Sequence, residues 1–294
     1  MATTKPTLTT DLLPLPNNPS VLIPHLGLGV YRSLDAQCVQ TCLTALTAGY
    51  RHIDTAQFYG NEAEVGLALR TCNIPRDQLF ITTKIMVPAG SPEATYEKLL
   101  ESVRKIAGEG EGAYVDLFLI HSPKSGREGR REMWLALERL FAEGKTRSIG
   151  VSNFGVAQVE EIKGYERAEG GKGVWPPHVN QLELHPWCQQ KTITSYCKQH
   201  GIVVQAYSPL VRQYKASEPT LVSLAEKYNK STNQILIRYS LQKGWVPLPK
   251  SDDPDRIRAN GDVYDFEISA GDMEVLDALD KGDEGAIVQA VVNE

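Results

Sequence analysis

Four residues with acid–base side chains stand close behind short apolar runs: Asp54, Tyr59, Lys84 and His121. A tyrosine hydroxyl ionises near about pH 10, so it donates a proton poorly at neutral pH unless its anion is stabilised. A lysine ammonium within a few ångströms would stabilise that anion, and an aspartate would hold the ammonium by an ion pair. We therefore expect Tyr59 to be the proton donor, supported by Lys84 and Asp54. His121 would orient a bound carbonyl oxygen and relay protons.

Each of these residues also has a simpler structural explanation. An aspartate after a strand is usually a turn or cap residue, a loop tyrosine usually packs against its neighbours, and a strand-end lysine is usually solvated. A lysine at a strand end also suits a Schiff-base aldolase, in which the amine attacks the carbonyl substrate. That alternative leaves five other residues without a role: Ser152, Asn153, Lys250, Ser251 and Arg256.

The elements that must position these residues alternate between strand-like and helix-like stretches. The run at 115–121 (Val-Asp-Leu-Phe-Leu-Ile-His) is almost continuously apolar, which is typical of a parallel strand covered on both faces. Strands are expected at residues 26–30, 52–54, 80–84, 115–121, 148–151, 179–182, 203–207 and 246–249. Helices are expected at residues 36–48, 62–70, 92–106, 131–142, 156–163, 192–200, 220–228, 232–242 and 270–279.

Eight parallel strands with helical connections predict a closed (β/α)8 TIM barrel, formed as a single domain by residues 1–294. A small β-hairpin is expected before the barrel, within residues 12–23, and a glycine-rich loop at 170–173. An open doubly wound sheet has a similar rhythm, but no G-x-G-x-x-G motif follows a strand. Because the ends of barrel strands meet at one mouth, the four acid–base residues would lie together there.

The composition predicts a globular chain whose main partner is neither nucleic acid nor a membrane. Of the 294 residues, 41% are hydrophobic and 23% are charged, and the net charge is −5. No secretory signal is visible at the N-terminus, and no run of about 18 apolar residues could span a bilayer, so a cytoplasmic protein is expected. The five cysteines lack a C-x-x-C pair, which favours reduced thiols over a disulfide framework or a zinc site.

Longer motifs extend this pattern over most of the chain. Ile-Asp-Thr-Ala-x-x-Tyr-Gly at 53–60 is followed by Ser-Ile-Gly-Val-Ser-Asn-Phe at 148–154, Asn-Gln-x-Glu-x-His-Pro at 180–186, Ala-Tyr-Ser-Pro-Leu at 206–210 and Leu-Pro-Lys-Ser at 248–251. Together they strongly resemble the aldo-keto reductase superfamily, and within it the microbial and fungal diketogluconate-reductase-like branch. The resemblance implies an NADPH-dependent reductase that converts an aldehyde or ketone to the alcohol, with catalytic residues Asp54, Tyr59, Lys84 and His121.

The resemblance also implies which residues meet the nicotinamide end of the cofactor, NADPH or NADP+. The carboxamide would be hydrogen-bonded by Ser152, Asn153 and Gln181. Tyr207 would stack on the nicotinamide ring, and Ser208 and Leu210 of the same loop would complete the site.

The adenosine end would be held by a second group of residues. The resemblance places Lys250, Ser251 and Arg256 around the 2′-phosphate and Asn260 beside the adenine. Two cations and a hydroxyl suit a phosphate group, since charge-assisted hydrogen bonds are the strong ones. Three acids in the same segment could instead pair with the cations: Asp252, Asp253 and Asp255.

The predicted substrate pocket departs from the pattern of many relatives. Met86 and Ser122 stand where tryptophans are common, whereas Tyr31 keeps an aromatic at a third pocket position. The pocket is therefore expected to be wider and more polar than in the aldose-reductase-like members. The segment at 211–219 and the tail after Gly285 are short, so two substrate-gating loops are expected to be reduced.

A non-enzymatic alternative accompanies this prediction. Some proteins with an aldo-keto reductase fold serve as cofactor-sensing subunits of larger assemblies, and four intact catalytic residues do not exclude that role. The chain shows no additional interaction segment, which weighs against that role. We expect a monomer or weak dimer whose partner is a small-molecule carbonyl substrate.

Overall fold

The computed structural model describes residues 6–167 and 173–293, so residues 170–172 of the expected glycine-rich loop lie outside the described residues. Two strands, β1 (Leu12–Leu15) and β2 (Asn18–Pro24), pair as an antiparallel hairpin. The other strands pair in parallel and in chain order. They are β3 (Leu28–Gly29), β4 (His52–Asp54), β5 (Phe80–Ile85), β6 (Leu117–Ile120), β7 (Ile149–Ser152), β8 (Val179–Glu183), β9 (Val203–Tyr207) and β10 (Val246–Leu248).

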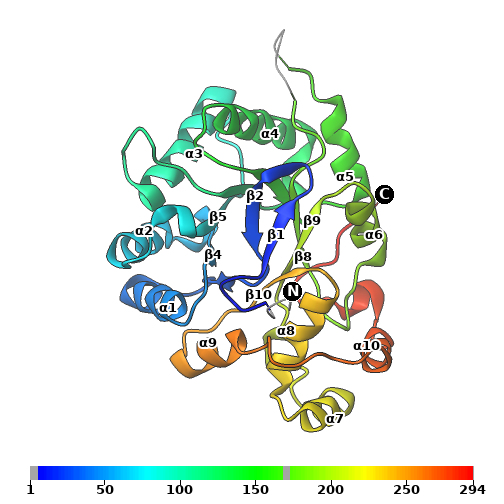
Figure 1. Cartoon of the computed structure of the whole chain (residues 1–294). Coiled ribbons are helices and arrows are strands. Elements are labelled where there is room, and N and C mark those ends of the chain that lie inside the picture. The colour runs from blue at the N-terminus through cyan, green and yellow to red at the C-terminus, as the bar shows by residue number, and fades with distance from the viewer. Residues whose placement is uncertain (1–5, 168–172, 294) are drawn as a thin grey trace, which may run out of the picture.

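Backbone hydrogen bonds join the two ends of this parallel sheet. The Gly27 N–H donates to the Pro247 carbonyl at 3.1 Å, and the Gly29 N–H donates to the Pro249 carbonyl at 3.0 Å. The strands therefore close into a ring, with the hairpin lying across one end of it (Figure 1). The predicted barrel with an N-terminal hairpin is confirmed.

Helices follow the strands and surround the barrel (Figure 1). Ser91 caps α3, because its hydroxyl accepts the Ala94 N–H at 3.2 Å. The helices are α1 (Asp35–Thr47), α2 (Glu62–Thr71), α3 (Pro92–Ala107), α4 (Gly126–Ala142), α5 (Val156–Glu161), α6 (Lys191–Gln199), α7 (Pro219–Tyr228), α8 (Thr232–Gln242), α9 (Pro254–Gly261) and α10 (Ala270–Asp277).

Several elements differ from the sequence-based prediction, and the physical reason can be given for α4, α9 and β6. Helix α4 begins at Gly126, ahead of the predicted 131, because its first turn is exposed and so lacks the apolar period that the prediction used. Helix α9 was not predicted at all, since only two of its residues are buried, although the Asp253 cap and Pro254 at its first position are ordinary start signals. Strand β6 is shorter than 115–121, and Val115 makes only an isolated bridge to Thr146.

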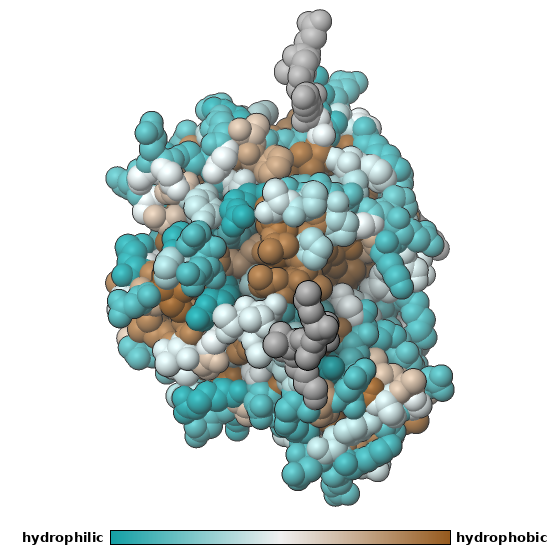
Figure 2. All heavy atoms as spheres, viewed as in Figure 1, coloured by the Kyte–Doolittle hydropathy of each residue, from teal (hydrophilic) through white to brown (hydrophobic). Residues whose placement is uncertain are grey.

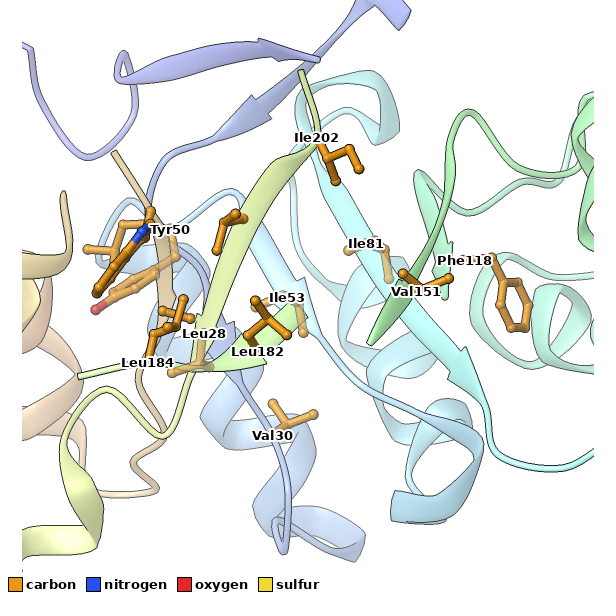
Figure 3. Packing of buried hydrophobic residues seen from close by; sticks show 14 of the residues in the cluster. Leu28, Val30, Tyr50, Ile53, Ile81, Phe118, Val151, Leu182, Leu184 and Ile202 are labelled. Carbon is orange, nitrogen blue, oxygen red and sulfur yellow. The ribbon is translucent and has the colours of Figure 1, made fainter. Parts of the chain in front are cut away.

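Strand β6 shows how the apolar runs build the core. Phe118 and Ile120 belong to the large cluster between the strands and the surrounding helices. Leu117 and Leu119 point to the opposite face and belong to a second cluster inside the barrel. Successive side chains of a strand alternate between faces, so a continuous apolar run is what a strand buried on both sides needs. Figure 3 shows part of the large cluster, including Phe118.

The second cluster lies where several strands begin, and the hairpin covers it. Hairpin residues Leu15, Val21 and Ile23 pack with the first residues of several strands, which are Phe80, Leu117, Val179 and Val246. Figure 2, viewed from the hairpin side, shows hydrophobic residues gathered at the centre of this face and hydrophilic residues around its edge. The amino-terminal end of the barrel is therefore closed by apolar packing. In the described ranges, no helix is both long enough and apolar enough to cross a bilayer.

Candidate active site

The four acid–base residues meet at the opposite, carboxyl-terminal end of the barrel. Asp54 ends β4, Lys84 lies in β5, His121 follows β6, and Tyr59 ends the 3₁₀ turn η1 (Gln57–Tyr59) after β4. Lys84 Nζ donates to Asp54 Oδ1 at 2.6 Å and to the Tyr59 hydroxyl at 3.4 Å. A further bond runs from Lys84 Nζ to the Thr55 carbonyl at 2.9 Å. These contacts link three of the residues in one hydrogen-bonded chain.

Hydrogen bonds of the buried side chain of Asn61 hold the turn that carries Tyr59 in place. Asn61 Oδ1 accepts the Thr55 hydroxyl at 2.6 Å. Asn61 Nδ2 donates to the carbonyls of Val30 at 2.9 Å and Ser33 at 2.8 Å, both in the loop after β3. Asn61 thus ties the loops after β3 and β4 together, which fixes the position of Tyr59. Asn61 was not predicted to belong to the site, although it lies two residues after Tyr59.

Burial shifts the pKa of the Tyr59 hydroxyl. Burial raises the pKa of Tyr59 well above its ordinary value, and Asp54 and Tyr31 raise it further. Burial also lowers the pKa of the Lys84 ammonium, although Asp54 opposes that change. Loss of solvation is the main cause of the higher pKa of Tyr59, and the stabilisation of the Tyr59 anion by Lys84 stays a prediction. Tyr59 keeps its proton at neutral pH.

His121 is neutral in this environment. Burial lowers its pKa to about 3, and the positive charge of Lys84 contributes to the same shift. Its ring stands edge-on to Tyr59, with the ring centres 5.6 Å apart, and edge-on to Phe58 at 6.3 Å. A neutral imidazole can donate one hydrogen bond to a carbonyl oxygen. His121 therefore suits substrate orientation and does not supply a positive charge.

A cleft of about 670 Å³ opens above these residues. Three of the four acid–base residues line it, while Lys84 is fully buried beneath. The three additional substrate residues predicted from the sequence, Tyr31, Met86 and Ser122, all line it. So do seven of the predicted cofactor residues: Ser152, Asn153, Gln181, Tyr207, Ser208, Leu210 and Lys250. The other three predicted cofactor residues are not part of its lining: Ser251, Arg256 and Asn260.

Buried amides form one wall of the cleft. Gln181 Nε2 donates to Asp54 Oδ2 and to Gln205 Oε1, both at 2.8 Å. Both amide hydrogens of Gln181 are therefore used, and its Oε1 accepts no hydrogen bond within the described part of the chain. The Tyr207 hydroxyl donates to Asn153 Oδ1 at 2.9 Å, which holds these two side chains together. The wall thus presents a free amide oxygen beside a tyrosine ring.

The predicted phosphate-binding residues lie around the start of α9. Lys250 forms an ion pair with Asp252. The alternative that the neighbouring acids pair with the cations is therefore correct for Lys250. Arg258 pairs with Asp255 at 2.7 Å. The Arg256 side chain is exposed and makes no ion pair with any described residue. Arg256 is therefore the cation that remains available to a ligand.

Several residues that line the cleft were not predicted. Phe58 adjoins Tyr59 in the sequence and lines the cleft. It is 62% exposed, which is unusual for a phenylalanine and indicates a binding site, but this exposure is visible only in the structure. Arg212 and Tyr214 line the cleft from the short segment after β9, and Val288 and Gln289 line it from the tail. The two segments expected to be reduced gating loops therefore still form part of its wall.

The chain is a β/α-barrel protein with a cleft at the carboxyl ends of the strands, where enzymes of this fold have their active sites. The model of the aldo/keto reductase family matches residues 25–281, and the chain belongs to that family. It is an oxidoreductase family, and carbonyl reduction is the activity that its named relatives support in general.

Individual relatives agree with this assignment. The chain is 39% identical over 277 residues to a glyoxal reductase of Bacillus subtilis, covering 94% of this chain and 95% of that one. It is 40% identical over 269 residues to a 9,11-endoperoxide prostaglandin H2 reductase of Trypanosoma cruzi, covering 89% of each chain. A crystal structure of an aldo-keto reductase enzyme from a deep-sea metagenome library matches with a TM-score of 0.83 at 36% identity, over 96% of this chain and 97% of that one.

Proposed function

We propose that the protein reduces an aldehyde or ketone to the alcohol with NADPH, and that Tyr59 is the proton donor. The observation that carries the proposal is the chain Asp54–Lys84–Tyr59, whose contacts are 2.6 Å and 3.4 Å and whose hydroxyl end lines the cleft. Family membership supports the reaction class, and the similarity to a glyoxal reductase supports a compact carbonyl substrate.

The residues of the cleft wall fit a nicotinamide. A carboxamide offers an N–H donor and a carbonyl acceptor, and Gln181 Oε1 is an acceptor without a partner among the described residues. The Tyr207 ring lines the same cleft and would stack on the nicotinamide. Ser152 and Asn153, which also line it, would complete the hydrogen bonds to the carboxamide. When bound, the dihydronicotinamide supplies the hydride for the carbonyl carbon.

Tyr59 and His121 would act on the carbonyl oxygen. Both side chains line the cleft and stand edge-on, so an oxygen could accept a hydrogen bond from each of them. The raised pKa of Tyr59 suits this role, because its hydroxyl stays protonated until an alkoxide, a much stronger base, develops beside it. Lys84 then stabilises the phenolate that remains after proton transfer, and Asp54 keeps Lys84 in place.

A preference for NADPH over NADH rests on Arg256, Lys250 and Ser251. Arg256 is exposed and can offer two parallel donors to a phosphate. Lys250 would have to share its charge between the ligand and Asp252, because the two already form an ion pair. We therefore assign most of the preference to Arg256.

The test is consumption of NADPH by the purified protein with a panel of aldehydes, ketoacids, sugars and ketosteroids. A carbonyl-dependent loss of NADPH absorbance is expected. A Schiff-base aldolase would instead be trapped covalently at Lys84 by borohydride in the presence of its substrate. A covalent adduct at Lys84 together with unchanged NADPH would contradict the proposal.

A further inference from the structure

A buried carboxylate at the end of β8 holds the C-terminal tail, residues 286–293. Glu183 Oε1 accepts the Ile287 N–H at 2.6 Å, and Glu183 Oε2 accepts the N–H groups of Val288 and Gln289, both at 2.8 Å. The Glu183 side chain is 0% exposed. Three consecutive backbone donors therefore converge on one carboxylate that solvent does not reach.

Neighbouring side chains complete this attachment. His185 Nε2 lies 3.0 Å from Glu183 Oε1. Gln190 Nε2 donates to the Glu183 carbonyl at 2.7 Å, and Gln190 Oε1 accepts the Val291 N–H at 2.9 Å. Four amides of the tail are thus bound by two side chains, Glu183 at the end of β8 and Gln190 in the segment that follows it. The tail has no regular secondary structure of its own in the described residues, so these bonds take the place of a helix or sheet ladder.

Two glycines allow the tail to lie directly on the barrel. A Cβ at Gly285 would be 1.7 Å from the Trp187 carbonyl oxygen. A Cβ at Gly155, in the loop after β7, would be 1.8 Å from the Val292 carbonyl oxygen. Both contacts are with backbone atoms, which cannot move aside as a side chain can. The tail is therefore seated closely on both sides of the Glu183 contacts.

Glu183 is charged in the folded protein. Burial opposes its ionisation, but the hydrogen bonds from His185 and from the backbone N–H groups of Ile287, Gln289 and Val288 outweigh burial and hold its pKa below the usual range. A buried carboxylate without such donors is strongly destabilised. The charge and the docked tail therefore stabilise each other.

We propose that Glu183 is a positioning residue for substrate selectivity: it holds the tail so that Val288 and Gln289 form a wall of the cleft. Both residues line the cleft, and both donate their backbone N–H groups to Glu183. Loss of the charge releases the wall while the acid–base residues stay in place. The selectivity part of this inference rests on the carbonyl reductase function proposed above.

The first test is residue-resolved amide hydrogen exchange of the full-length protein without ligand. The amides of Ile287, Val288 and Gln289 should be protected, in contrast to those of Ala290 and Val292, whose N–H groups have no partner within the described part of the chain. In Glu183→Gln the three amides should lose protection by roughly tenfold or more, since each lost bond is charge-assisted. Equal exchange of all five amides in the wild type overturns the proposal.

The second test compares a compact dicarbonyl, such as glyoxal, with a bulky aromatic aldehyde. Glu183→Gln should change the ratio of their kcat/KM values by roughly tenfold, with a larger effect on KM than on kcat. Glu183→Asp, which keeps the charge on a shorter stem, should fall between the wild type and Glu183→Gln. A purely structural role would lower both kcat/KM values in proportion and leave their ratio unchanged, which would overturn the proposal.

Two further variants serve as a control and as a substitute for Glu183→Gln. Glu226→Gln removes an exposed glutamate on α7 and should alter neither exchange in the tail nor selectivity. Should Glu183→Gln fail to fold, Val288→Ala tests the wall directly, because it should improve the relative kcat/KM of the bulky aldehyde; an unchanged ratio contradicts the proposal. A wild type that reduces no carbonyl would refute the proposed function, while the exchange data still decide whether Glu183 holds the tail.

Discussion

The two ends of the barrel are built from the same strands but have opposite interiors. Where the strands begin, Phe80, Leu117 and Val179 pack against the hairpin, and the cavity is filled by apolar side chains. Where the strands end, Asp54 and Lys84 are buried as a charged pair beneath an open cleft. The first arrangement lowers the free energy of the fold, and the second costs solvation energy.

The difference teaches how one barrel supports both stability and chemistry. A buried charged pair is weak support for folding, because desolvation of the ions offsets their attraction. The apolar end has much less of this cost, since burial of its hydrophobic side chains is favourable. Substitutions at the two ends should therefore separate loss of activity from loss of stability.

The largest expected effect is at the carboxyl-terminal end. Tyr59→Phe should lower kcat by about 10²- to 10⁴-fold, because it removes the positioned acid. NADPH binding and thermal stability should change little, since only one hydroxyl is lost. The measurements are steady-state kinetics, cofactor titration and thermal unfolding. Tyr114→Phe, on the outside of the barrel beside Arg76, is the control. Retention of more than about a tenth of the wild-type kcat would exclude Tyr59 as the acid.

The matching change at the amino-terminal end is Ile23→Ala. Ile23 is fully buried in the hairpin, and its truncation should lower the free energy of unfolding by about 2–5 kcal/mol while kcat of the folded protein is kept. Leu22→Ala on the same strand is the control, because Leu22 is 48% exposed. Denaturant unfolding measures both. An equal loss of stability in the two variants would show that burial of the hairpin's apolar side chains does not stabilise the amino-terminal end of the barrel.

A smaller effect is expected outside the barrel mouth, at Arg256. Arg256→Ala should weaken NADPH binding by about 10- to 150-fold and NADH binding hardly at all, since a charge-assisted hydrogen bond contributes roughly 1.5–3 kcal/mol. Arg258→Ala is the control, because Arg258 is paired with Asp255. Paired dissociation constants for both cofactors provide the test. Equal weakening of NADPH and NADH would mean that Arg256 stabilises the segment and does not bind the phosphate.

The last prediction concerns stability in acid, to which both ends of the barrel should contribute in the same direction. Burial lowers the pKa of His52, at the start of β4, and of His121, after β6, to about 3. The ordinary histidine pKa is about 6.5, so between these values the unfolded chain binds more protons than the folded one. The stabilisation is complete above about pH 6.5 and is lost as the pH falls, by about 1.4 kcal/mol per pH unit for each histidine.

Urea unfolding at several pH values between neutrality and about pH 5 measures this slope. His52→Gln should reduce the slope, because it removes one of the buried histidines that bind a proton on unfolding. A stability that stays constant or rises as the pH falls over this range would contradict the prediction.

The strand-and-helix order and the placement of Asp54, Lys84 and His121 at strand ends could be read from the sequence. Alternating burial within a strand and the meeting of strand ends in a barrel are local rules, so a pattern of residue types is enough to apply them. Helix α9 and the start of α4 were not predicted, because exposed turns show little apolar periodicity. The contacts of the tail could not be predicted, because nothing in residues 286–293 indicates which part of the barrel they contact.

By itself, the sequence determined the barrel, its hairpin and the gathering of the acid–base residues at one mouth. Only the tertiary structure decided that the pKa of Tyr59 is raised, that Lys250 is already paired with Asp252, and that Glu183 holds the tail against the cleft. The physical reason is that each of these depends on solvation and on distances between segments far apart in the chain. Residue types show which groups can ionise or donate, whereas burial and contact set the free energy of each state.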